Sequence, residues 1–222
     1  MSRVWNFIQR VGIVAAFFIF IQVPPVAVEI ANRYPHSELI VAGMMALFIV
    51  LMIAVIILAR QTYRRYNQLG RPRGIRLGTV LLGYLVILFV EGLLGNLNQL
   101  VYHQSETANN ANLAMMLGHN QLITLVFSFS AVVLSPIAEE YIFRGILTNI
   151  FFKADSFWPK VILSGIVFSC GHLSTNPISF AMYAMMGMVM AFVYRRTGDI
   201  RNSMILHGIN NLVAMMILLG QV

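Results

Sequence analysis

Charge is scarce in this sequence. Charged residues make up 10% of the 222 residues and hydrophobic residues 59%, and the mean hydropathy is +0.77. Soluble domains carry about 25% charged residues, so the composition excludes an ordinary soluble domain and predicts a membrane protein. The single cysteine, Cys170, excludes an intramolecular disulfide and is expected to be a small buried hydrophobe.

Apolar runs long enough to cross a bilayer recur along the whole chain. They predict an all-α fold, a polytopic transmembrane helix bundle of about seven spans, at residues 11–31, 39–59, 77–100, 122–152, 159–174, 177–195 and 202–220. The first run could be a cleaved signal peptide, because arginines precede it. Apolar character continues past Pro24–Pro25, which favours an uncleaved span with a kink there.

Basic residues gather in alternate loops. Of the 15 Lys and Arg residues, all except Arg33 and Arg144 fall before the first span or in the loops after the second, fourth and sixth spans. The positive-inside rule therefore places the N-terminus in the cytoplasm. The basic loop 61–76 is expected to face lipid headgroups, so the net charge of +7 does not indicate a nucleic-acid partner.

The chain is predicted to be one membrane domain. Residues 1–110 form its N-terminal spans and residues 120–220 a core that carries the polar motifs. There is no convincing internal repeat. An ion or proton carrier would be expected to show inverted repeats with paired broken helices, so this class ranks low.

After the loops and the span ends are set aside, six charged or histidine residues remain at depth in the predicted spans. Each charge near the centre of a helix costs about 2.5–3.5 kcal/mol, so such residues are functional candidates by default. Helical spacing puts Glu140 and Arg144 on one face as an i,i+4 pair, and turns Glu139 toward a different neighbour. The others lie on further spans, and polar groups in a bundle turn inward to meet: Glu91, His172 and His207.

The motifs that are missing narrow the chemistry. There is no G-x-S-x-G or H-E-x-x-H stretch, which argues against a serine hydrolase and a zincin-type helix. Both aspartates, Asp155 and Asp199, fall in predicted loops, which removes an aspartyl dyad. A carboxylate with two imidazoles can activate a water or bind a metal that does so, and an amide or imidazole donor can stabilise an oxyanion.

Three motifs follow one another on successive apolar spans. "EEYIFR" (139–144) fits E-E-x-x-x-R, "FSCGH" (168–172) fits F-x-x-x-H, and "HGINN" (207–211) fits H-x-x-x-N. Together they resemble the CPBP family of intramembrane proteases, which comprises CAAX proteases and bacteriocin-processing enzymes and is also called the Abi family. The resemblance covers about residues 120–220.

The resemblance implies roles for the motif residues. Glu139 looks like the base that activates water, with His172 helping to hold that water. His207 and Asn211 look like the oxyanion donors, and Glu140 and Arg144 would brace the site. Within the family both a metal site and a metal-free glutamate mechanism are considered, so zinc held by Glu139, His172 and His207 stays a candidate cofactor.

Several alternatives stay open from the sequence. A non-catalytic membrane scaffold, such as a bacteriocin immunity protein, is the main rival to a protease. Glu91 is either a helper of the site or a hydrogen-bonded structural carboxylate. The loop histidines, His36, His103 and His119, show no metal-ligand spacing. Short loops favour a multi-pass protein of a bacterial plasma membrane. The resemblance implies a membrane-embedded peptide or protein as the substrate, and the oligomeric state is open.

Overall fold

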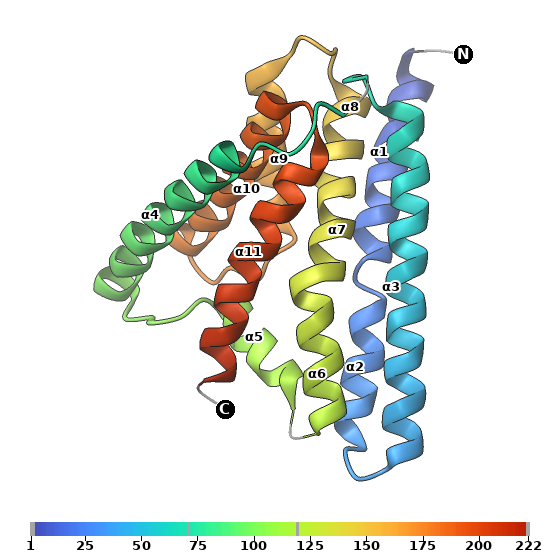
Figure 1. Cartoon of the computed structure of the whole chain (residues 1–222), viewed down its shortest axis with the longest axis vertical. Coiled ribbons are helices and arrows are strands. Elements are labelled where there is room, and N and C mark those ends of the chain that lie inside the picture. The colour runs from blue at the N-terminus through green and yellow to red at the C-terminus, as the bar shows by residue number, and fades with distance from the viewer. Residues whose placement is uncertain (1–2, 71, 119, 221–222) are drawn as a thin grey trace. The chain divides into compact units, whose positions relative to one another are not determined.

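The computed structural model describes residues 3–70, 72–118 and 120–220 (Figure 1). Throughout these residues the regular elements are helices, with no strand. The predicted all-α, polytopic fold is confirmed.

Six helical segments of the described chain are long and apolar enough to cross a membrane: Val4–Arg33, Glu38–Tyr66, Leu77–Tyr102, Gln121–Phe151, Pro177–Thr197 and Ile200–Leu219. The predicted span at 159–174 corresponds to α9, Phe157–Cys170, which has 14 residues. At 1.5 Å per residue α9 is about 21 Å long, which is less than the ~30 Å hydrocarbon core. This stretch is therefore an apolar helix shorter than a full span.

The first apolar segment is kinked where the sequence predicts. Helix α1 covers Arg3–Phe20 and α2 covers Pro24–Arg33, with both prolines in the first turn of α2. Proline has no N–H to donate to the preceding turn, so it interrupts α1 but starts α2 without loss of a hydrogen bond. The two helices are counted as one candidate span.

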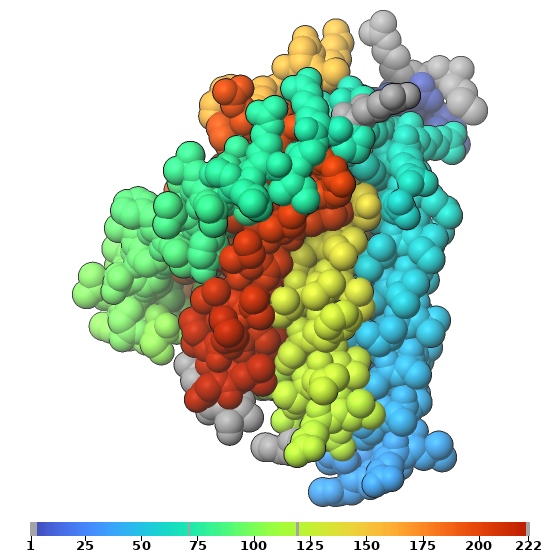
Figure 2. Space-filling model, in the orientation of Figure 1, coloured from blue at the N-terminus to red at the C-terminus, as the bar shows by residue number. Residues whose placement is uncertain are grey.

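The chain forms two compact units, each built from separate stretches of sequence. The first unit contains residues 3–67 and 115–151, with α1, α2, α3 (Glu38–Tyr66) and the segment from α6 (Gln121–Phe129) through α7 (Ser135–Glu139) to α8 (Leu147–Phe151). Helix α3 packs along this segment, as Figures 1 and 2 show. Aromatic pairs join the elements: Phe48–Phe127, Tyr63–Tyr141 and Phe18–Phe143.

The second unit contains residues 68–114 and 152–220, with α4 (Leu77–Tyr102), α9, α10 (Pro177–Thr197) and α11 (Ile200–Leu219). Helix α5 (Ala108–Leu117) belongs partly to each unit, because the division of the chain between residues 114 and 115 falls within it. The core of the second unit is aliphatic and Met-rich, and its buried members include Ile87, Met186, Met190 and Leu206.

Small residues let α9 and α10 approach closely. A Cβ added to Gly187 would lie 2.9 Å from the Cα of Gly165, and a Cβ on Gly165 would overlap the carbonyl oxygen of Ala184. The sequence predicts a small-residue face at Gly187 and Ala191, and both are buried. Cys170 was expected to be buried but is exposed, because α9 turns its neighbours Phe168 and Ser169 inward instead.

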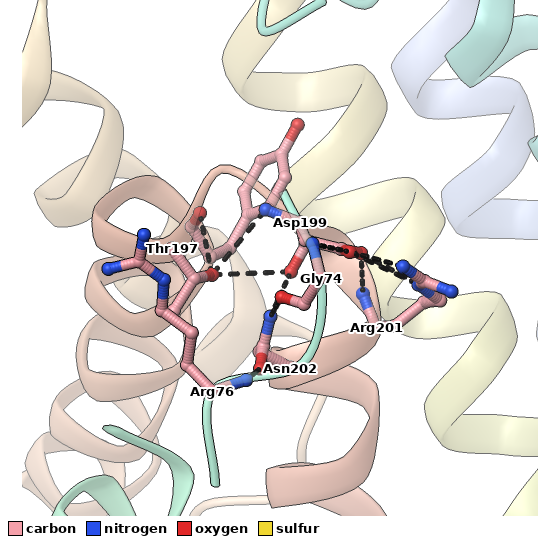
Figure 3. A network of polar contacts seen from close by, with 7 residues as sticks. Gly74, Arg76, Thr197, Asp199, Arg201 and Asn202 are labelled. Carbon is pink, nitrogen blue, oxygen red and sulfur yellow. Dashed lines mark hydrogen bonds and ion pairs between the residues drawn. The ribbon is translucent and has the colours of Figure 1, made fainter. Parts of the chain in front are cut away.

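A polar network fixes the start of α4 to the turn between α10 and α11 (Figure 3). The Asp199 carboxylate accepts from the Gly74 backbone N–H at 3.2 Å and from the Arg201 guanidinium at 2.6 Å. The Asn202 side chain accepts from the Arg76 N–H at 2.7 Å and donates to the Gly74 carbonyl at 3.2 Å. We call this network the Asp199 clamp.

A second network holds the other end of α4. Asn176 caps α10 with its side-chain oxygen and donates through Nδ2 to Asn98 and to Gln104, each at 2.8 Å. Asn98 in turn donates to the Gln104 carbonyl at 3.0 Å. Helix α4 is therefore tied to α10 and α11 near both of its ends.

Candidate active site

The E-E-x-x-x-R motif lies in an irregular part of its helix. Two π-helical segments, Ser130–Leu134 and Glu140–Ile146, flank α7. Pro136 stands in the first turn of α7 and cannot donate a backbone hydrogen bond, which gives a physical cause for the first irregularity. Widened turns of this kind are frequent at functional sites, and the sequence pattern did not predict them.

The predicted ion pair is present. Arg144 Nε lies 3.2 Å from Glu140 Oε2, and neither side chain has exposed surface. The Arg144 charge also interacts with the Glu139 carboxylate. Two carboxylates therefore share one guanidinium inside an apolar segment, which offsets part of their desolvation cost.

Glu139 differs from the pair in its exposure. Its side chain is half-buried, whereas Glu140 and Arg144 are completely buried. Of the three charged groups in the motif, Glu139 is thus the one at the surface of the helical segment. A reacting water needs an accessible carboxylate, and of these three residues Glu139 is the one with exposed surface.

His172 is held by aromatic rings in the second unit. Its Nδ1 lies 2.8 Å from the Phe168 carbonyl oxygen. A carbonyl only accepts, so Nδ1 carries a proton, and in the neutral ring Nε2 is the nitrogen that can accept. The ring stacks on Tyr183 at 4.8 Å and lies 4.2 Å from the Phe168 ring.

His207 borders the same phenylalanine. It is 3% exposed, and its ring meets Phe168 edge-on at 5.6 Å. The structure therefore brings the two predicted histidines, which come from the segment after α9 and from α11, to one aromatic side chain. The phenylalanine of the F-x-x-x-H motif is Phe168, the residue that contacts both histidines. The motif alone does not reveal this contact.

Asn211 and its neighbour Asn210 behave differently. Asn211 is half-buried on α11. Asn210 is 6% exposed and donates through Nδ2 to Glu91 Oε1 at 3.2 Å. Sequence reasoning singled out Glu91 but missed Asn210, although "INN" offers two amides and only one is needed for the motif.

The predicted site residues form two groups. Glu139, Glu140 and Arg144 belong to the first unit, and His172, His207 and Asn211 belong to the second. Among the described residues, no group of three or more His, Cys, Asp or Glu side chains is placed to hold a metal ion. His36 and His103 lie in different units, and His119 is outside the described residues.

Comparison with known proteins bears on the resemblance. Residues 121–213 match a family model described as "Type II CAAX prenyl endopeptidase Rce1-like". The resemblance to the CPBP proteases is confirmed. The matched range contains all three motifs.

A Bacillus subtilis protein named "Putative membrane peptidase YdiL" is 26% identical over 152 residues, which are 68% of this chain and 60% of that relative. The alignment thus spans less than two thirds of the relative's length. No solved structure gives a significant match. The chain is a multi-pass membrane protein whose C-terminal part resembles CAAX-type proteases.

Proposed function

We propose that this chain is an intramembrane endopeptidase that hydrolyses peptide bonds of membrane-associated substrates with a glutamate-activated water. The observation that carries the proposal is the half-buried Glu139 beside a fully buried Glu140–Arg144 pair in an apolar helical segment. The family match supports it, because one continuous range includes the acidic motif and both histidine motifs.

The chemistry follows from the groups available. Glu139 takes a proton from the water while the water oxygen attacks the peptide carbonyl carbon. Glu139 later returns a proton to the leaving amine. His172 accepts a hydrogen bond from that water through Nε2, since its Nδ1 proton is directed to the Phe168 carbonyl. His207 and Asn211 donate to the oxyanion of the tetrahedral intermediate.

Glu140 and Arg144 have a supporting role in this scheme. Their ion pair is buried on both sides, so neither group contacts bulk water. The Arg144 charge interacts with both neighbouring carboxylates, and so supports the position of Glu139. A loss of Arg144 therefore leaves both carboxylates without this opposite charge.

Zinc enters only through the resemblance. If a metal takes part, Glu139, His172 and His207 are the proposed ligands. A strong chelator separates the two mechanisms, because it abolishes a zinc-dependent cleavage and leaves a glutamate-only cleavage intact. The proposed location is a bacterial plasma membrane.

The test is cleavage of a panel of membrane-anchored peptides by purified protein in liposomes. The panel contains single-span peptides and a farnesylated peptide with a C-terminal Cys-aliphatic-aliphatic-X sequence. Wild type is compared with Glu139→Ala and His172→Ala, each with and without chelator. Glu38→Ala and His36→Ala are matched controls, because both residues are exposed and lie outside the motifs.

Loss of cleavage in both site variants, with activity kept in both controls, supports the protease. Cleavage that survives Glu139→Ala overturns the glutamate mechanism. If wild type cleaves no peptide and Glu139→Ala still protects cells from a bacteriocin, the chain is a scaffold of the immunity type instead.

A further inference from the structure

Glu91 is an intramembrane carboxylate that the three motifs do not include. It lies in α4, outside the range that matches the family model, and it is half-buried. A carboxyl group inside a membrane span is costly, so its presence calls for a specific interaction.

Its interaction is with the helix that carries the predicted oxyanion donors. Glu91 Oε1 accepts from Asn210 Nδ2 at 3.2 Å, which connects α4 to α11. Asn210 follows His207 by three residues, so the two share a face of α11, and it directly precedes Asn211. We therefore expect a change in the Asn210 side chain to alter the orientation of the turn of α11 that carries His207 and Asn211.

Glu91 also reaches the surroundings of the other histidine. Its charge acts on the Tyr183 hydroxyl, which lies 2.6 Å from the Thr107 hydroxyl. The Tyr183 ring stacks on His172. Glu91 thus interacts with Asn210 of α11 and electrostatically with Tyr183 of α10, the residue that stacks on His172.

A purely architectural role explains less. The Asp199 clamp already fixes the start of α4 to α11, and Asn98 with Gln104 and Asn176 ties its other end to α10. The helix does not need a charged group in its middle to stay in place. A bond to Asn210 adds control over one turn of α11, which is the turn with His207 and Asn211.

We infer that Glu91 is a positioning residue: its carboxylate fixes the Asn210 side chain and thereby the orientation of His207 and Asn211 toward the oxyanion. The inference rests on the proposed protease function. Misplacement of catalytic donors by about 1 Å can reduce turnover about 100-fold, whereas substrate affinity depends on other contacts.

The experiment measures kcat and KM in liposomes on a reporter peptide of the panel that wild type cleaves. Glu91→Ala and Asn210→Ala are each expected to lower kcat about 10- to 100-fold, with KM within about twofold of wild type. Glu91→Gln is expected to recover most of kcat, because its amide oxygen still accepts from Asn210. The double variant Glu91→Ala/Asn210→Ala should be no slower than the slower single variant.

Asn96→Ala is the matched control, since Asn96 is an exposed amide of α4 that donates to the Gly92 carbonyl of the same helix. Unchanged kcat in Glu91→Ala overturns the inference, as do multiplicative losses in the double variant or a Glu91→Gln enzyme as slow as Glu91→Ala. Should Glu91→Ala fail to fold, Glu91→Gln and Asn210→Ala decide the question. Wild type without cleavage overturns the proposed function itself, whereas active Glu91→Ala beside inactive Glu139→Ala overturns the positioning role alone.

Discussion

At the scale of single residues, the motif helix shows how a charge persists in an apolar segment. The side chains of Glu140 and Arg144 both have no exposed surface, and Arg144 Nε lies 3.2 Å from Glu140 Oε2. Removing two buried charges together can be nearly neutral, whereas removing one partner leaves an uncompensated charge. The pair is therefore better understood as a brace for Glu139 than as a source of net stability.

Arg144→Leu should destabilise the protein by about 3–5 kcal/mol, because it leaves Glu140 buried without its guanidinium. The double variant Glu140→Leu/Arg144→Leu should recover much of this loss, since no charge of the pair then stays buried. Unfolding in detergent by heat or denaturant measures both. A double variant as unstable as Arg144→Leu would show that the unpaired charge of Glu140 is not the cause of the instability.

At the scale of elements, backbone contact and polar networks determine how helices meet. Gly165 and Gly187 allow α9 to lie directly on α10, and this places Phe168 next to His172 and His207. The Asp199 clamp joins the α10–α11 turn to the loop before α4. These contacts build the histidine side of the candidate site.

Gly165→Ala should destabilise the second unit by about 1–3 kcal/mol, because the added methyl group overlaps the Ala184 carbonyl oxygen and backbone cannot move aside cheaply. Gly95→Ala is the matched control in α4, where an added Cβ meets nothing within 4 Å. Thermal unfolding in detergent compares the two. Equal stability of both variants would contradict close packing of α9 on α10.

The Asp199 clamp should make stability depend on pH. Hydrogen bonds from the Arg201 side chain, more than any other cause, lower the pKa of the Asp199 carboxyl below its usual range. A group with a lowered folded-state pKa stabilises the fold above its unfolded pKa and loses that contribution as pH falls through the folded value. Stability should therefore decline as the medium becomes more acidic than the ordinary aspartate range.

Asp199→Asn removes the titrating group but keeps a capping oxygen, so its stability should fall less than that of wild type between neutral and acidic pH. Glu106→Gln, at an exposed loop position, should keep the wild-type slope. The measurement is the unfolding midpoint in detergent over this pH range. Parallel curves for wild type and Asp199→Asn would show that the clamp does not titrate.

At the scale of the whole molecule, the pattern of basic residues predicts the direction of the chain in the bilayer. The loops at 68–76 and 103–107 fall on opposite ends of α4, which is one of the six candidate spans. The first loop is rich in arginine, and the second has no Lys or Arg. The positive-inside rule places the first loop in the cytoplasm.

Cysteine labelling tests this orientation. In a Cys170→Ser background, Ser105→Cys should react with a membrane-impermeant maleimide on intact bacterial cells, whereas Pro72→Cys should react only after permeabilisation. Both positions are exposed, so access to the reagent depends on the side of the membrane. Labelling of Pro72→Cys alone on intact cells would reverse the predicted orientation.

The sequence predicted the architecture well because hydrophobic length and proline position act locally. Six of the seven predicted spans, the kink at Pro24 and the Glu140–Arg144 pair could all be predicted from spacing. The shortness of the span at 159–174 could also be predicted, from the polar stretch that closes it. The exposure of Cys170 could not, since it depends on which face of α9 packs against α10. The π-helical turns and the bond between Glu91 and Asn210 also escaped, because they arise from tertiary contacts that no periodicity encodes.

The proposal that Glu139 activates the attacking water is tested most directly by the cleavage rate of Glu139→Gln, compared with wild type on one reporter peptide in liposomes. Glutamine keeps the size and much of the hydrogen bonding of glutamate but cannot take a proton from water. General-base catalysis raises the reaction rate about 100- to 10,000-fold. We therefore expect Glu139→Gln to lower the cleavage rate by a factor of that size, with the protein still folded. Cleavage by folded Glu139→Gln at the wild-type rate would contradict it.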